Sequence, residues 1–314
     1  MTMGRIVVAG VASLAVHLAV EQFPVGYTPV GQPRWLCSGA GGAGAQIAAI
    51  LRALGDDVRL CTVVGRDPVG RLVRQQLRTG GLAGPGVVDG PGTSQTVVLV
   101  APDGRRIVYP HLAVVNAVEY PQATFVEALR GAELAVLTNT EFVRALLPPA
   151  ALRGVPIAVD VNVIADLDDG FYQPWLEVAD IIFCSHEKLP CPAPEWIARV
   201  MARYPGAALA AVGCGAAGTI LGLRDGRLVS AAAVAPLGVR NTSSAGDSLF
   251  AGFLHGWLAT GNPVEALSGA VVLAGWRIGH RNPTAVLLSE AELAGLRLRH
   301  PVRITIRSWD KSGS

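Results

Sequence analysis

The segment Asn241-Thr-Ser-Ser-Ala-Gly-Asp247 places a carboxylate directly after a run of small residues, at the start of a predicted helix. Gly261 marks the helix end, and the apolar positions between them have helical spacing: Leu249, Phe250, Phe253, Leu254, Trp257 and Leu258. The free N–H groups of a helix's first turn, with the positive end of its dipole, bind anions. A carboxylate in the same turn can accept a proton from a hydroxyl group. Phosphoryl transfer to an alcohol requires both parts side by side.

The same pattern also fits an ordinary helix start. A Ser or Thr cap with an acidic residue in the first turn stabilises a helix by about 1 kcal/mol without any catalytic role. Both interpretations place Asp247 in the first turn, and they differ in whether turnover depends on it. The spacing alone leaves both open.

A second glycine-rich stretch, Gly39-Ala-Gly41-Gly-Ala-Gly44, satisfies the dinucleotide-binding pattern G-x-G-x-x-G. That pattern requires a strand immediately before it and an acidic residue about 20 positions later. Only the short Pro33–Cys37 precedes the glycines, and the next predicted strand ends in Gly65-Arg66, one residue before Asp67. A dehydrogenase is therefore disfavoured.

Short buried apolar runs alternate with helical segments along most of the chain. The predicted strands are Arg5–Gly10, Val58–Val64, Leu134–Leu137, Ile157–Val161, Ile181–Cys184 and Ala208–Val212, with a last strand after Arg297. Such alternation predicts a doubly wound, mostly parallel α/β sheet with helices on both faces. Ala45–Leu54 is expected to be one of these helices, closed by Gly55.

A β-hairpin interrupts the alternation. Thr93–Val100 and Arg105–Tyr109 flank the turn Pro102-Asp-Gly104. We expect residues 13–37 and 93–117 to form one small sheet, separate from a main domain of residues 1–12, 38–92 and 118–314.

Bulk properties exclude several classes of protein. The net charge is +2 without a basic cluster, which argues against a nucleic-acid partner. Lys188 and Lys311 are the only lysines, so neither a Walker loop nor the protein-kinase lysine strand is present. Five cysteines without C-x-x-C spacing argue against zinc and disulfides. Ile6–Val20 is too short to span a bilayer. We expect a cytoplasmic protein without a membrane partner.

Several motifs, in order along about residues 4–295, resemble the ribokinase family (the PfkB-type carbohydrate kinases). Thr242-x-x-Ala-Gly-Asp247 resembles the C-terminal signature of that family, and Gly41-Gly42-Ala43-Gly44-Ala45-Gln46 resembles the N-terminal one. The further matches are Gly65-Arg-Asp67-Pro-Val-Gly70, Asp103-Gly104-Arg105-Arg106, Gly215-x-x-Gly218 and Arg277-x-Gly279.

The resemblance implies an ATP-binding domain covered by a β-sheet lid, formed by the small sheet, over the phosphate acceptor. It implies Mg²⁺ with ATP, often a monovalent cation such as K⁺ near the Asn241 loop, and in many members a homodimer through the lid. By match, Asp247 is the catalytic base, and the N–H groups of Ser244, Ala245 and Gly246 form an anion hole. The expected acceptor contacts are Ser13, Gly41, Gly42, Gln46 and Asn162. The expected nucleotide contacts are Ser185, Gly213, Gly215, Gly218 and Thr242.

The chain departs from the family pattern at positions that bear on the substrate. Ala15 stands where an Asp commonly binds sugar hydroxyls, which favours an acceptor with fewer vicinal hydroxyls or a bulkier one. Glu187 lies one position before the usual metal-site carboxylate, and we expect it to order water around Mg²⁺. The other departures are Gln46 for Asn, Asn241 for Asp, Ser244 for Gly, Lys188 for Glu and Gly213 for Thr.

The sequence therefore predicts an ATP-dependent kinase acting on a hydroxyl of a sugar, nucleoside or related small alcohol. The alternative is a non-catalytic, ligand-binding relative with the same fold. Lys188 and Asn241 favour that alternative, whereas retention of Ala245-Gly246-Asp247 argues against it.

Overall fold

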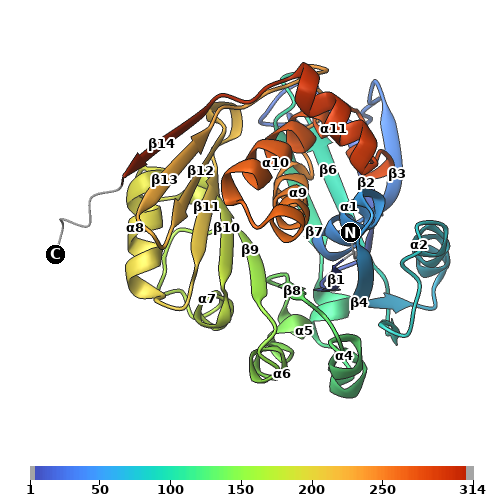
Figure 1. Ribbon diagram of the computed structural model, residues 1–314. Helices are drawn as coiled ribbons and strands as arrows, with labels where there is room; N and C mark the ends of the chain where they lie inside the picture. The colour runs from blue at the N-terminus through green and yellow to red at the C-terminus, as the bar shows by residue number, and fades with distance from the viewer. Residues whose placement is uncertain (1–3, 309–314) are drawn as a thin grey trace.

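One sheet of ten strands and a second sheet of four strands organise the chain (Figure 1), in a computed structural model that describes residues 4–308. The large sheet has the order β14-β13-β12-β11-β10-β9-β8-β1-β4-β5. Its strands are β1 (Arg5–Ala9), β4 (Asp57–Gly65), β5 (Val87–Gly90), β8 (Leu134–Leu137), β9 (Ile157–Val163), β10 (Ile181–Ser185), β11 (Leu209–Gly213), β12 (Thr219–Leu223), β13 (Arg227–Ala231) and β14 (Ile304–Ser308). The strands from β5 to β11 pair in parallel, which confirms the predicted α/β fold.

Helices cover both faces of the large sheet, because side chains along each strand point alternately to two cores. In β1, Ile6 and Val8 belong to one core, whereas Val7 and Ala9 belong to the other. The first face carries α1 (Ala43–Leu54), α2 (Pro68–Thr79), α9 (Ala245–Thr260), α10 (Pro263–Arg277) and α11 (Glu290–Arg299). The second carries α3 (Ala113–Asn116), α4 (Gln122–Ala128), α5 (Glu141–Arg144), α6 (Leu147–Leu152), α7 (Gln173–Val178) and α8 (Ala193–Arg203). Figure 1 shows α9 and α10 lying together against the sheet.

The small sheet has the order β3-β2-β6-β7, with β2 (Ser13–Ala19), β3 (Leu36–Gly41), β6 (Ser94–Val100) and β7 (Arg106–His111). It contains the predicted hairpin. One boundary prediction was wrong: β3 continues to Gly41, so residues 38–41 lie in the small sheet and not in the main domain. Glycine makes this pairing possible, because a Cβ on Gly41 would lie 2.6 Å from the Cβ of Ala15 on the neighbouring strand.

The far edge of the large sheet was not predicted in detail. β12, β13 and β14 pair antiparallel and extend the sheet beyond β11. Gly55 and Gly261 end α1 and α9 in the left-handed conformation, as the sequence predicts. Within residues 4–308, no helix is both long and apolar enough to cross a membrane.

Candidate active site

The predicted site residues gather at the carboxyl ends of neighbouring strands, where α/β sheets bind ligands. β9, β10 and β11 are adjacent in the sheet, and the last two end at Ser185 and Gly213. Helix α9 packs on β9 and β10. Its first turn starts beside Asp160 of β9. A Cβ added to Gly246 would lie 3.6 Å from the Oδ2 atom of Asp160.

The first turn of α9 has no side-chain cap. Ser244 occupies the N-cap in the left-handed conformation, with φ 58° and ψ 16°, and its side chain accepts no bond from the first turn. This conformation costs an L-residue roughly 1–2 kcal/mol. The helix provides no carbonyl partner for its first N–H groups, including those of Gly246 and Asp247. Ala245 N donates to Thr242 O at 3.3 Å, so the open donors of this strained cap are the N–H groups of Gly246 and Asp247. Open N–H groups at a helix start are the geometry of an anion-binding site.

Charged neighbours surround the Asp247 carboxylate. Burial raises its pKa, while the charge of Arg277, a hydrogen bond from the Ser244 side chain and the charge of Arg106 lower it. Arg106 belongs to lid strand β7 and Arg277 to the last turn of α10, so the two cations approach from different parts of the chain. A carboxylate whose pKa is raised is a better proton acceptor for a hydroxyl group.

The motif match places Arg277 in the family's closing element near the adenine, but it does not predict that the charge of Arg277 acts on Asp247. Arg277 is fully buried, its Nη1 donates to Val286 O at 2.9 Å, and its Nη2 donates to Gln46 Oε1. Burial lowers the pKa of Arg277 to about 10, while the charge of Asp247 raises it. Gln46 Nε2 donates to Ala40 O at 2.7 Å. Both polar atoms of the Gln46 side chain thus contact protein groups, so the geometry gives no support to its predicted acceptor contact.

A second carboxyl group lies next to the anion-binding turn. Asp160 is buried, and its Oδ1 accepts from Asn162 N at 2.8 Å. Burial and, to a smaller extent, the charge of Asp247 raise the pKa of Asp160 to about 7, although the hydrogen bond from Asn162 N lowers it. Asn162 is left-handed, with φ 57°, and its Nδ2 donates to Asn139 Oδ1 at 3.0 Å. Asn139, which the sequence analysis did not select, thereby holds the predicted acceptor contact in place.

The acceptor side of the site is built from small residues. Ser13 is fully buried, and its Oγ lies 3.4 Å from Thr96 Oγ1 on the neighbouring lid strand. Gly42 has φ 86°, and a Cβ there would lie 2.5 Å from Val11 O. Close backbone approach therefore explains Gly42, as it explains Gly41 in β3. The predicted acceptor contacts of both glycines stay predictions.

The predicted nucleotide contacts form a row after β10 and β11. Ser185 Oγ accepts from Glu187 N at 3.3 Å, and Gly213 O accepts from His186 Nδ1 at 3.0 Å. Gly215 has φ 56° and Gly218 has φ 95°, a backbone region that favours glycine. A Cβ added to Gly218 would also lie only 2.0 Å from Ala231 O.

Glu187 contacts the lid. Its Oε1 lies 3.2 Å from Arg106 Nη1, an ion pair that joins the turn after β10 to strand β7. Across residues 4–308, no cluster of three or more His, Cys, Asp or Glu side chains is arranged to hold a metal ion. Mg²⁺ bound to nucleotide phosphates needs only one or two protein carboxylates, so the residues present fit that group.

The lid hairpin also binds the anion-hole loop directly. Thr242 N and Thr242 Oγ1 both donate to Gly104 O, at 3.1 and 2.8 Å. Gly104 has φ 83°, and a Cβ there would lie 2.6 Å from Val239 Cγ1. This contact places Arg106, two residues later, at the anion-binding turn.

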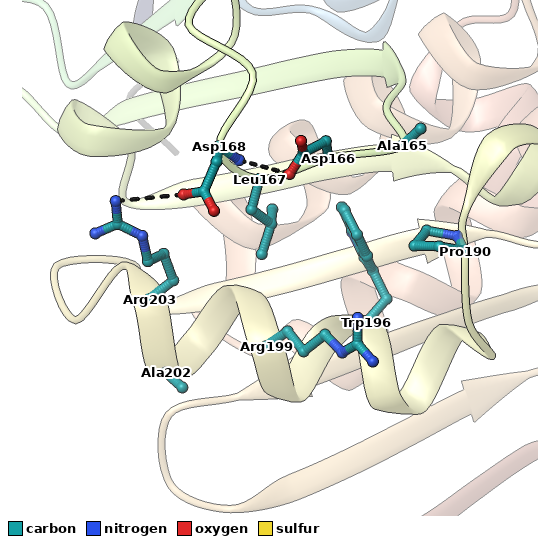
Figure 2. Close-up of a pocket in the computed structure, with 9 residues that line it drawn as sticks. All are labelled: Ala165, Asp166, Leu167, Asp168, Pro190, Trp196, Arg199, Ala202 and Arg203. Carbon is teal, nitrogen blue, oxygen red and sulfur yellow. Dashed lines mark hydrogen bonds and ion pairs between the residues drawn. The ribbon is translucent and has the colours of Figure 1, made fainter.

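A surface hollow elsewhere is separate from these residues. Figure 2 shows it between the loop after β9 and helix α8, where Trp196 forms part of the wall. Asp168 lies 3.6 Å from Arg203, and Arg199 pairs with Glu195. Asp166 in the same hollow accepts from Asp168 N at 2.9 Å, and none of the predicted site residues lines it.

A parallel α/β sheet, a lid, an open helix N-terminus and a carboxylate beside it define an enzyme of the ribokinase-like phosphotransferase class. The chain belongs to the pfkB family of carbohydrate kinases, whose family model matches residues 3–290. The predicted family is thereby confirmed, and the chain is a carbohydrate kinase.

Similar proteins of known name agree with this family. The chain is 27% identical over 303 residues to an ATP-dependent ribose-1-phosphate kinase of Halopiger xanaduensis, covering 95% of this chain and 99% of that protein. It is 31% identical over 244 residues to acarbose 7(IV)-phosphotransferase of Actinoplanes sp., covering 75% and 79%. The structure of a microbiome-derived acarbose kinase superimposes with a TM-score of 0.84, at 21% identity, over 95% of this chain and 100% of that one.

Proposed function

We propose that this kinase transfers the γ-phosphoryl group of ATP to a hydroxyl of a sugar, nucleoside or related small alcohol, with Asp247 as the base. The observation that carries the proposal is the first turn of α9. There a carboxylate of raised pKa stands next to uncapped N–H groups and near two arginines.

Each step has residues suited to it. Asp247 accepts the proton of the attacking hydroxyl, and the N–H groups of Ser244, Ala245 and Gly246 stabilise the charge on the transferring group. Mg²⁺ bound with ATP would supply positive charge next to the phosphates. The proposed nucleotide contacts are Ser185, Gly213, Gly215, Gly218 and Thr242. Glu187 is the proposed carboxylate for the metal's water shell, a role that requires Arg106 to release it.

The lid face supports an acceptor with few vicinal hydroxyls or with a bulky substituent. Strand pairing places Ser13, Ala15 and Thr96 together on one face of the lid, without a carboxylate among them. Small neutral side chains leave room and provide single hydroxyl contacts, whereas an Asp would bind two neighbouring hydroxyls. Ser13 and Asn162 are the proposed polar contacts. The cytoplasmic location and the homodimer through the lid stay predictions.

An acceptor panel tests this proposal. The protein is incubated with magnesium and γ-labelled ATP, together with ribose, ribose 1-phosphate, inosine or acarbose, and labelled product is separated from ATP. We expect transfer to at least one acceptor and a much weaker signal with Asp247→Asn. A non-catalytic relative predicts ATP binding by calorimetry without transfer to any acceptor, and that result would contradict the proposal.

A further inference from the structure

Asn241 is a fully buried residue directly before the anion-hole turn. Its Oδ1 accepts from Ser243 N at 3.0 Å, and its Nδ2 donates to Arg281 O at 2.9 Å. The same Nδ2 lies 3.1 Å from His17 Nδ1 on lid strand β2. These partners define the orientation of the amide, because the reverse orientation would place its oxygen against a carbonyl oxygen.

His17 completes this contact as a neutral acceptor. Its side chain is almost fully buried, and burial lowers its pKa to about 4. A ring that accepts at Nδ1 carries its hydrogen on Nε2. That Nε2 has no hydrogen-bond partner among the described residues. Both amide hydrogens of Asn241 are therefore used, one towards the segment after α10 and one towards the lid.

The groups around this loop do not fit the monovalent cation that the family resemblance implies. A hard cation needs several oxygen ligands with free lone pairs and gains from a negative charge. Ile278 O already accepts from Arg240 N at 2.8 Å and from Asn241 N at 3.0 Å, and Arg281 O accepts from the amide. Asn241 itself presents hydrogens to Arg281 O and carries no charge. The carbonyl oxygens of Ile278 and Arg281 are thus occupied by donors from the loop.

We propose that the Asn241 amide takes the place of a monovalent cation in this kinase. It ties the anion-hole loop to Arg281 and to the lid, so that turnover and folding are independent of K⁺. Asn241 is a positioning residue, because it acts through the loop and not on the phosphoryl group. The inference rests on the proposed role of residues 244–247 as the anion hole.

The test compares K⁺ with tetramethylammonium at constant ionic strength, in wild type and in Asn241→Asp. Wild-type melting temperature and turnover should be the same in both salts. Asn241→Asp removes the donors and places a carboxylate against Arg281 O. We therefore expect a lower melting temperature that K⁺ raises, and turnover at least about fivefold higher in K⁺ than in tetramethylammonium.

Asn262→Asp is the matched control, because Asn262 is an exposed helix cap that Asp can replace, and it should not respond to K⁺. Melting temperature requires no acceptor, so a failure here is distinguishable from a failure of the proposed phosphoryl transfer. Wild-type turnover or stability that depends on K⁺ would overturn the inference, even if Asn241→Asp does not fold. A folded Asn241→Asp protein that responds equally to both salts would also overturn it.

Discussion

Helices α9 and α10 follow one another in the chain, yet the first turn of α10 has a side-chain cap and the first turn of α9 has none. In α10, Asn262 Oδ1 accepts from Val264 N and Glu265 N, at 3.0 and 3.4 Å, and Pro263 fills the first position. In α9, Ser244 is left-handed and makes no such cap. One helix start is satisfied by its own residues, whereas the other is left open.

The two carboxylates occupy the same position, the third residue of each helix, as Asp247 and Glu265. Glu265 is exposed and pairs with Arg297 at 3.2 Å, whereas burial raises the pKa of Asp247. Helix position alone therefore does not make a catalytic base. The difference lies in what surrounds each carboxylate. Asp247 is near open N–H groups, the lid, the buried Arg277 and the partly exposed Arg106, whereas Glu265 is exposed to solvent.

The largest contrast is expected between the two carboxylates themselves. Asp247→Asn removes the base while keeping its shape, so turnover should fall by at least about a hundredfold with little loss of ATP affinity. Glu265→Gln should leave turnover unchanged, because that carboxylate contacts only Arg297. Turnover and melting temperature are measured on both variants. Near-normal turnover in a folded Asp247→Asn protein would mean that the two helix starts are equivalent.

A second test concerns Arg106, the lid arginine that pairs with Glu187 and whose charge also acts on Asp247. Arg106→Gln removes a cation near the transferring group, and we expect turnover to fall by roughly tenfold to a hundredfold. Arg105→Gln is the control, because Arg105 is exposed and pairs with its neighbour Asp103. Steady-state kinetics with varied ATP separate a loss in kcat from a change in KM. Equal effects of the two substitutions would show that Arg106 has no specific role in phosphoryl transfer.

Asp160, the carboxyl group beside the first turn of α9, predicts that the stability of the protein depends on pH. No such group lies beside the first turn of α10 among the residues discussed above. The pKa of Asp160 is raised to about 7 in the folded protein, against about 3.9 in an unfolded chain. Between these values the folded protein retains a proton that the unfolded chain has released, so stability falls as pH rises from about 4 to about 7. In Asp160→Asn this fall should be weaker. Urea unfolding of both proteins across that range checks the sign, and parallel curves would contradict it.

The smallest effect is expected at the satisfied helix start. Asn262→Ala removes the cap of α10 and should lower the free energy of unfolding by about 1 kcal/mol. Turnover should be unchanged, since α10 begins away from the proposed site. Asn262→Asp preserves the cap and should be nearly neutral. Denaturant unfolding measures both variants, and a loss of turnover in Asn262→Ala would show that this helix start also supports catalysis.

Sequence patterns predicted the parts of the structure that depend on local order. Buried apolar runs identified the parallel strands, and small residues before Asp247 identified the open helix start. The contacts that define the environment of that helix start are distant in sequence: Arg277 with Gln46, Arg106 with Glu187, and Asn241 with His17, which are 224 positions apart. Periodicity carries no information about such pairs. Likewise, residues 38–41 were assigned to the main domain, because only their pairing with β2, and not local propensity, makes them the end of β3.

The contact between Gly104 and Thr242 has a consequence for any movement of the lid hairpin. A single carbonyl oxygen holds the lid hairpin to the loop that carries the phosphate-binding turn. Raising the hairpin leaves both Thr242 donors without their acceptor until water or a ligand oxygen replaces it. Raising the hairpin would also break the ion pair between Arg106 and Glu187, so the phosphate-binding loop and the turn after β10 would lose their lid contacts together.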